Sequence, residues 1–339
     1  MTVTEVDRAE RLRPVVIERC VNSGVSTSTS GAATASCTRL AWGYCRHVHL
    51  LYCGSGWLPI VETIRARVPD ATVAVWDRRV PLVDVVRDVD VLLPSNAPIT
   101  RAVIEAAPKL QLIQQPAAGV EGIDHDAARE RGIPICNAPG TNHVAVAELA
   151  LYLLLALARR IPHAAFAARK IGEPIGFELA GKTLGIIGMG RSGSALADRA
   201  RALGMTVQAL RRGDDKPAFF AACDAISIHC PLTAETRHLV DAAALAAMRP
   251  GALLINCARG GVIDRDALAG ALDHLGGVGL DVVWDEPGDP ADPLYSHPKV
   301  LVTPHVAGST REAFTRIGDV IVENLARLAR RAPLLHRIR

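Results

Sequence analysis

Three features that mark particular classes of protein are missing from this sequence of 339 residues. Its charges nearly cancel, leaving a formal net charge of +3, so neither a nucleic acid nor a membrane surface is expected as a partner. Its eight cysteines form no CxxC pair and no zinc-ligand spacing, so no metal site is expected. Because most of them lie in apolar runs, we predict buried, reduced thiols in a protein of the cytoplasm.

The third missing feature is an apolar run long enough to cross a membrane. The longest, Val144 to Ala158, is shorter than the about 20 residues that a membrane-spanning helix needs, and two arginines follow it. We predict a buried helix there. Residues 1–40 are small, polar and without periodicity, which predicts a disordered tail, and they lack the apolar core of a secretory signal. A targeting peptide is the alternative interpretation of this tail.

From about residue 47 onward, apolar strand-like runs alternate with helical stretches. This alternation predicts parallel sheets covered by helices, an α/β fold. A looser segment after residue 158 interrupts it once, so we expect two domains with Rossmann-like or flavodoxin-like parallel sheets and a cleft between them. The predicted strands are "HVHLLYC", "TVAVW", "VLLP", "QLIQQ" and "IPIC" in the first domain, and "TLGII", "TVQAL", "AISIH", "ALLIN", "GVGLDV" and "KVLVT" in the second.

A glycine-rich turn in the second domain carries a specific chemical signal. Gly188, Gly190 and Gly193 have the G-x-G-x-x-G spacing, directly after an apolar strand and directly before an alanine-rich helix. In that context the glycines allow a tight turn, close approach of the backbone to a pyrophosphate, and close helix–strand packing. We therefore predict a dinucleotide-binding Rossmann domain over 141–309. The predicted substrate domain is 41–140 plus 310–339, because the final amphipathic helix returns to the first domain.

The end of the next predicted strand bears on the choice of cofactor. Enzymes that prefer NAD place an acidic residue there for the ribose hydroxyls, but this chain has Arg211 and Arg212. An arginine suits the 2′-phosphate of NADP, so NADP is favoured over NAD. Two alternatives stay open: the arginines are a solvated charge pair, or a shift in register brings Asp214 to this position.

The other strands of this domain end in polar or conformationally special residues. The carboxyl ends of parallel strands line one crevice, where ligands bind. A histidine can exchange a proton near neutral pH, and an adjacent carboxylate favours its charged form. An arginine fits a carboxylate, and inside a protein it needs such a partner. Each residue alone is commonly structural, but together they predict reduction of a 2-keto acid, with His305 protonating the carbonyl oxygen and Arg259 holding the carboxylate. The strand-end residues are His229, Pro231, Cys257, Ala258, Arg259, Asp281, Glu286 and His305.

Several motifs in a fixed order resemble the D-isomer-specific 2-hydroxyacid dehydrogenases, from about residue 47 to the C-terminus. The resemblance implies that Arg259 binds substrate and that Glu286 and His305 form the acid–base pair. It also implies that backbone amides near Ala118 and Gly119 cradle the substrate carboxylate, and that the protein is a homodimer built through its cofactor domains. The motifs are "NAPGTNHVAVAE", "GKTLGIIGMGRSG", "HCPLTAETRHLV", "INCARGGVIDRDAL", "GLDVVWDEP", "TPHVAGST" and "AAGVEGID".

The resemblance extends the predicted cofactor site. It implies that Asp281 holds the nicotinamide carboxamide and that Arg191 and Ser192 approach the pyrophosphate. The full set of predicted cofactor-binding residues is Gly188, Gly190, Arg191, Ser192, Gly193, Arg211, Arg212, His229, Pro231, Cys257, Ala258, Asp281 and Gly308.

The chain departs from the family pattern in three places. The segment at 213–223 is short where a further strand and turns usually lie. That strand is at the sheet edge in the usual order 3-2-1-4-5-6, so its loss does not prevent the fold but thins the adenine side of the cofactor pocket. Ser192 stands where an apolar residue is common, and the tail over 1–40 is additional.

The sequence therefore predicts an NAD(P)-dependent D-2-hydroxyacid dehydrogenase acting on a small 2-keto acid such as glyoxylate or hydroxypyruvate. The alternative is a non-catalytic, NAD(H)-sensing protein similar to the transcriptional corepressors of the family. A third interpretation is an enzyme that has lost much of its cofactor affinity. The residues that select the substrate are expected to include Trp57, Asn96 and Trp284.

Overall fold

The computed structural model of the protein describes residues 47–161 and 171–338, and residues 40–339 form one compact unit. The predicted tail over 1–40 lies outside the described residues. Within the described ranges, no helix combines the length and the apolar character that a membrane span requires. The long apolar run instead forms helix α5 (His143–Ala158), whose Leu153 and Leu157 are buried as predicted.

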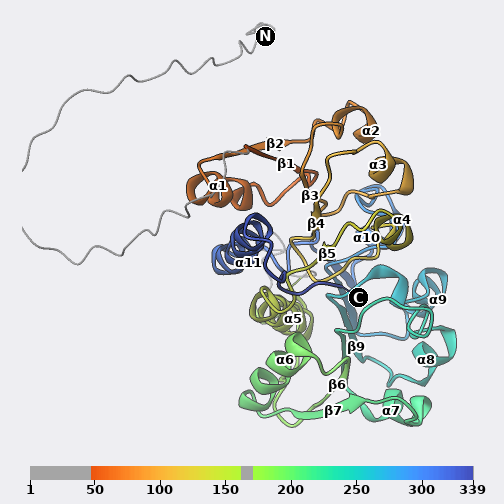
Figure 1. The fold of residues 1–339 in the computed structure, drawn as a ribbon. Coiled ribbons are helices and arrows are strands. Elements are labelled where there is room, and N and C mark those ends of the chain that lie inside the picture. Colours follow the sequence, from red (N-terminus) through yellow and green to blue (C-terminus); the bar gives the residue numbers. More distant parts are fainter. Residues whose placement is uncertain (1–46, 162–170, 339) are drawn as a thin grey trace, which may run out of the picture. The chain divides into compact units, whose positions relative to one another are not determined.

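The first sheet has five parallel strands in the order β2-β1-β3-β4-β5 (Figure 1). Leu50 of β1 pairs in register with Val91 of β3 on one side and with Val73 of β2 on the other. Both partners are apolar. The central strands are apolar on both faces because helices cover both: α1 and α11 pack on one face, and α2, α3 and α4 on the other. The bounds are β1 (Val48–Tyr52), β2 (Ala71–Val75), β3 (Val91–Leu93), β4 (Leu112–Gln114), β5 (Ile135–Cys136), α1 (Leu58–Arg67), α2 (Leu82–Val85), α3 (Arg101–Glu105) and α4 (His125–Glu130).

The last helix, α11 (Arg311–Ala329), returns to the first sheet. Its apolar side chains recur at helical spacing, so Ile317, Ile321 and Leu325 lie on one face and are buried against α1 and β1. Thr310 caps its start by accepting a hydrogen bond from the Ala313 backbone N–H. The prediction that the C-terminal helix packs on the first domain is confirmed (Figure 1).

The second sheet has six parallel strands in the order β11-β10-β9-β8-β6-β7. Helices α5 and α6 cover one face, and α7, α8 and α9 cover the other (Figure 1). All eleven predicted strands are therefore present, in two parallel sheets. The bounds are β6 (Thr183–Ile187), β7 (Thr206–Leu210), β8 (Ala225–Ile228), β9 (Leu253–Asn256), β10 (Gly277–Leu280), β11 (Val300–Val302), α6 (Arg191–Ala202), α7 (Lys216–Ala222), α8 (Ala242–Ala247), α9 (Arg265–Ala271) and α10 (Pro293–Ser296).

The strand order of the second sheet reverses between β6 and β8. The chain runs from β6 outward to β7 and then crosses to β8 on the other side of β6, which makes this pair the switch point where α/β sheets bind ligands. Among the described strands, β7 is the edge of the sheet. The short 213–223 segment holds α7, whose Phe219 and Phe220 enter the core, in place of a further strand.

The described cysteines are unpaired and buried, as predicted from their apolar surroundings. Burial raises the pKa of the Cys136 and Cys223 thiols to about 11, so both stay protonated near neutral pH. Cys20, Cys37 and Cys45 lie outside the described residues.

Candidate active site

A cavity of about 1430 Å³ opens among the loops that follow the strands of both sheets. Its wall takes residues from the turns after β1, β3 and β4 of the first sheet and after β6, β8, β9, β10 and β11 of the second. It exceeds the volume of about 300–1,000 Å³ that is usual for a drug-sized ligand, and so has room for a dinucleotide beside a small substrate. The predicted site residues that line it are Ala118, Gly119, Gly190, Arg191, Ser192, His229, Pro231, Cys257, Ala258, Arg259, Asp281, Glu286, His305 and Gly308.

The glycine turn after β6 has the features that a pyrophosphate site needs. Gly188 has a φ of 101°, which only glycine adopts readily, and a Cβ at Gly193 would overlap the Gly188 carbonyl oxygen. Gly190 precedes α6 without a side-chain cap and has open space where a Cβ would stand. The first amides of α6 and its positive dipole end therefore face the cavity at Gly190. These residues fit a dinucleotide.

The two glycines predict different outcomes on substitution. Gly190→Ala is expected to leave the free energy of unfolding nearly unchanged but to weaken dinucleotide binding by about tenfold or more, because the methyl group occupies the space of the pyrophosphate. Gly193→Ala is the matched comparison, and it should lower stability because its methyl group meets backbone. Urea unfolding and fluorescence titration with NADH and NADPH measure the two effects. Unchanged binding by the Gly190→Ala protein would contradict the assignment.

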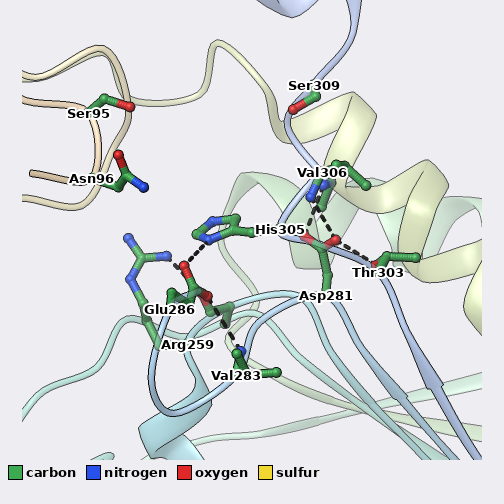
Figure 2. A network of polar contacts seen from close by, with 12 residues as sticks. Ser95, Asn96, Arg259, Asp281, Val283, Glu286, Thr303, His305, Val306 and Ser309 are labelled. Carbon is green, nitrogen blue, oxygen red and sulfur yellow. Dashed lines mark hydrogen bonds and ion pairs between the residues drawn. The ribbon is translucent and has the colours of Figure 1, made fainter. Parts of the chain in front are cut away.

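His305 and Glu286 are in direct contact across the loops after β11 and β10 (Figure 2). His305 Nδ1 lies 2.6 Å from Glu286 Oε2, and the Val283 backbone N–H reaches Glu286 Oε1 at 3.4 Å. Burial favours a higher pKa for Glu286, but the hydrogen bond and charge of His305 outweigh it and the pKa is lowered. Glu286 is therefore a carboxylate near neutral pH, and its hydrogen bond can orient the imidazole of His305.

Asp281 holds the loop that carries His305. Its side chain is 1% exposed and accepts hydrogen bonds from Thr303 Oγ1 at 2.6 Å and from the backbone N–H groups of Val306 at 2.8 Å and Ala307 at 2.9 Å (Figure 2). Burial raises the pKa of Asp281, and these hydrogen bonds partly offset that rise. Both carboxylate oxygens are thus engaged in fixing the backbone on either side of His305, which itself has a φ of 52°.

Arg259 lies in a turn after β9 that is fixed by a buried amide. Asn256 is fully buried, donates to the Arg259 carbonyl oxygen at 2.9 Å and accepts from the Ala258 N–H at 3.0 Å. The Arg259 guanidinium contacts the Ala258 carbonyl oxygen at 2.7 Å and Glu121 Oε2 at 3.6 Å. Gly119 approaches so closely that a Cβ there would overlap Arg259 Nη2. The predicted substrate loop and the predicted substrate arginine are therefore adjacent.

Sequence reasoning missed the positions of Asn256 and Glu121. Asn256 is the polar end of the predicted strand "ALLIN", and Glu121 lies inside the predicted substrate loop "AAGVEGID". A buried amide at the end of a strand needs hydrogen-bond partners, which was the available signal for Asn256.

His229 is in the cavity wall but is not suited to donate a proton. Burial lowers the pKa of its imidazole to about 4, so it is neutral near neutral pH. Its Nε2 lies 2.9 Å from Ser227 Oγ, while its buried Nδ1 has no partner among the described residues. An unpaired polar atom at the edge of a ligand cavity is consistent with the predicted cofactor contact.

Arg211 and Arg212 are exposed beyond the end of β7 and are not in the cavity wall. The Arg211 backbone N–H donates to Asp214 Oδ2 at 2.8 Å, so this turn is closed by a carboxylate. A role for either arginine in cofactor choice stays a prediction. Gly188 and Gly193 shape the glycine turn from behind the cavity wall.

Of the residues expected to select the substrate, Trp57 and Asn96 line the cavity. Trp57 Nε1 donates to Ser309 Oγ at 2.8 Å, which joins the turn after β1 to the loop that follows His305. Trp284 does not line it, contrary to expectation. Its Nε1 donates to the Ile263 carbonyl oxygen at 2.7 Å, and its ring packs against the core of the second sheet. This position buries the apolar ring and gives its one polar atom a hydrogen-bond partner.

Comparison with known proteins identifies relatives over most of the described chain. The family profile "D-isomer specific 2-hydroxyacid dehydrogenase, NAD binding domain" matches residues 151–307. A D-3-phosphoglycerate dehydrogenase from Methanocaldococcus jannaschii is 38% identical over 290 residues, which are 79% of this chain and 55% of that protein. The chain thus spans little more than half the length of that relative.

Two further relatives are covered over most or all of their length. A glyoxylate reductase from Korarchaeum cryptofilum is 37% identical over 268 residues, which are 72% of this chain and 81% of that protein. The crystal structure of a protein from Thermus thermophilus has a TM-score of 0.78 and 35% identity, covering 86% of this chain and all of that one. With the glycine turn and the two parallel sheets, these matches show that the chain belongs to the D-isomer specific 2-hydroxyacid dehydrogenase family.

Proposed function

We propose that the protein catalyses reversible hydride transfer between NAD(P)H and a small 2-keto acid, giving a D-2-hydroxy acid. The observation that carries this proposal is that the His305–Glu286 pair, Arg259 and the uncapped turn at Gly190 line one cavity. The relatives whose names include glyoxylate reductase and D-3-phosphoglycerate dehydrogenase support the same class of reaction.

A bound NAD(P)H would supply the hydride for the keto carbon and would itself be oxidised to NAD(P)⁺. Gly190, Arg191 and Ser192 at the start of α6 would hold its pyrophosphate. His305 donates the proton that the carbonyl oxygen needs, and Glu286 keeps the imidazole oriented for that step. The C=O group becomes CH–OH, so one hydride and one proton are consumed per turnover.

Arg259 and the adjacent loop bind the substrate at its carboxylate. The guanidinium offers a planar set of donors, and the loop at Ala118 and Gly119 brings backbone against it. Glu121 Oε2 lies 3.6 Å from Arg259 Nη2, so the same loop also places a carboxylate beside the guanidinium. A substrate carboxylate bound at Arg259 gains a charge-assisted pair of hydrogen bonds there.

We expect NADP to be preferred over NAD, because the first residues after β7 are arginines and not an acidic residue. Arg211→Asp should shift the ratio of kcat/KM for NADPH over NADH toward NADH by about tenfold, since it removes a cation suited to the 2′-phosphate and adds an acceptor for the ribose. Steady-state rates with both cofactors measure the ratio. An unchanged ratio would remove Arg211 from the cofactor site.

The activity is tested by fluorescence titration with NADPH and NADH, followed by rates with glyoxylate, hydroxypyruvate and longer 2-keto acids. Binding of a dinucleotide together with turnover of a keto acid supports the proposal. Binding without turnover of any keto acid supports the NAD(H)-sensing alternative, and the absence of binding contradicts both. The homodimer that the resemblance implies stays a prediction.

A further inference from the structure

Two adjacent arginines follow β2, and only one of them has a counter-charge. Arg79 Nε lies 2.9 and 3.0 Å from the two carboxylate oxygens of Asp77, and Arg79 Nη2 lies 2.6 Å from Asp77 Oδ2. These hydrogen bonds from Arg79 lower the pKa of Asp77 to about 2. The Asp77 carboxylate is therefore charged near neutral pH and is paired with Arg79. No such partner faces Arg78 among the described residues.

Neutral groups hold Arg78 in place. Its Nη2 donates to Asn96 Oδ1 at 2.8 Å and reaches the Cys53 carbonyl oxygen at 3.4 Å. Its guanidinium carbon lies 5.4 Å from the ring centroid of Trp76, a distance at which a cation is attracted by an aromatic face. These contacts orient the guanidinium without neutralising it, so its remaining donors are available to an anion.

Arg78 lines the same cavity as Arg259 and His305. A short chain of contacts joins the two arginines. Gly119 abuts Arg259, and Gln115 Nε2 donates hydrogen bonds to the carbonyl oxygens of both Gly119 and Ser95. The residue after Ser95 is Asn96, which accepts a hydrogen bond from Arg78. Figure 2 shows Ser95 and Asn96 across the cavity from Arg259 and His305.

Arg191 of the cavity wall is assigned to the pyrophosphate in the proposed function, and the remaining charged groups named so far have partners. Glu286 contacts His305, Glu121 contacts Arg259, and Asp281 is satisfied by the loop after β11. The substrate carboxylate is assigned to Arg259 in the proposed function. Arg78 is an exposed cation in the wall of a substrate cavity, held by neutral groups and without a counter-charge, so it is suited to a second anionic group on the substrate.

We propose that Arg78, supported by Asn96, binds a second anionic group at the far end of the substrate. The substrate class is thus 2-keto acids that carry a distal carboxylate or phosphate, and not simple monoanionic ones. This inference rests on the proposed function, because it takes the carboxylate next to the keto group to be bound at Arg259. Arg78 acts on substrate affinity and has no part in the transfer of hydride or proton.

The experiment compares matched pairs of keto acids that differ in the distal charge. 3-Phosphohydroxypyruvate is paired with hydroxypyruvate, and 2-oxoglutarate with 2-oxopentanoate, so the two pairs separate phosphate from carboxylate. The wild-type protein should have a kcat/KM at least about tenfold higher for the dianion in one of the pairs. Arg78→Ala should abolish that preference by raising the KM of the dianion about 10- to 100-fold, with the monoanion unchanged. Arg78→Lys should restore part of the preference because it keeps the charge.

Arg87→Ala is the control, since Arg87 is also an exposed arginine of the first domain but is not in the cavity wall. It should leave both substrates of each pair unaffected. Equal kcat/KM values within both pairs for the wild-type protein would overturn the inference, as would an equal loss for monoanion and dianion in Arg78→Ala. Turnover of the monoanions keeps the proposed function intact in either case, whereas no turnover of any keto acid contradicts the proposed function itself.

Discussion

Replacing His305 by alanine is expected to lower kcat for keto-acid reduction by about 10²- to 10⁴-fold, the usual contribution of a general acid. The carbonyl oxygen would then have to take its proton from water, because His229, which also lines the cavity, is held neutral by its burial. Dinucleotide affinity should stay within about twofold of wild type, since the turn at Gly190 is untouched. Steady-state kinetics and a fluorescence titration measure the two quantities.

His238→Ala is a closely matched control for His305→Ala. Both histidines have a positive φ, 51° and 52°, and both contact a carboxylate, Asp264 at 3.6 Å for His238 and Glu286 at 2.6 Å for His305. Only His305 lines the cavity. If relief of backbone strain or loss of a surface ion pair were responsible, the two variants would behave alike. Full activity in the His305→Ala protein would contradict the assignment of the proton donor.

Replacing Arg259 by alanine is expected to lower kcat/KM for the keto acid by about 10²- to 10³-fold, because two charge-assisted hydrogen bonds to the substrate carboxylate are lost. Arg259→Lys should recover only part of this, since an ammonium group lacks the planar pair of donors. Binding of the dinucleotide alone should change little. Initial-rate kinetics over a range of keto-acid concentrations measure the effect.

Arg265→Ala provides the comparison for Arg259. Arg265 is a nearby arginine in a strong ion pair, 2.6 Å from Asp292, but it is not in the cavity wall. Its loss should affect stability slightly and kinetics not at all. An Arg259→Ala protein that retains wild-type kcat/KM while Arg265→Ala behaves as expected would show that the substrate carboxylate is bound elsewhere.

The sheets were predictable because each strand is a short apolar run, and central strands such as β3, β8 and β9 are buried on both faces. Parallel strands covered by helices need such runs. The turn at Gly188 was also predictable, because its positive φ and close backbone contacts require glycine. The resemblance to the family implied that His305 and Glu286 form a pair, and strand ends that share one sheet edge predicted that both line one crevice. That inference is correct because β10 and β11 are neighbours in the sheet.

Other parts of the site depend on tertiary contacts that a linear pattern does not contain. Asp281 accepts hydrogen bonds from backbone amides more than twenty residues away, so its hold on the His305 loop becomes visible only once β10 and β11 are paired. Trp284 lies inside the motif "GLDVVWDEP", whose Asp281 and Glu286 line the cavity, yet its ring turns to the core because the Ile263 carbonyl oxygen accepts a hydrogen bond from the indole. Arg78 and Arg79 are adjacent residues of the same type, so the sequence does not distinguish them. Only the geometry shows that Asp77 pairs with Arg79.

The central claim is that hydride and proton are delivered to a 2-keto acid within the cavity that holds His305, Glu286 and Arg259. Product analysis after reaction with NAD(P)H deuterated at the transferable position of the nicotinamide tests it most directly. The account predicts a D-2-hydroxy acid with one deuterium on C2, formed by the wild-type protein and lost in His305→Ala. An L-2-hydroxy acid, a product without deuterium at C2, or equal deuterium transfer in the His305→Ala protein would contradict it.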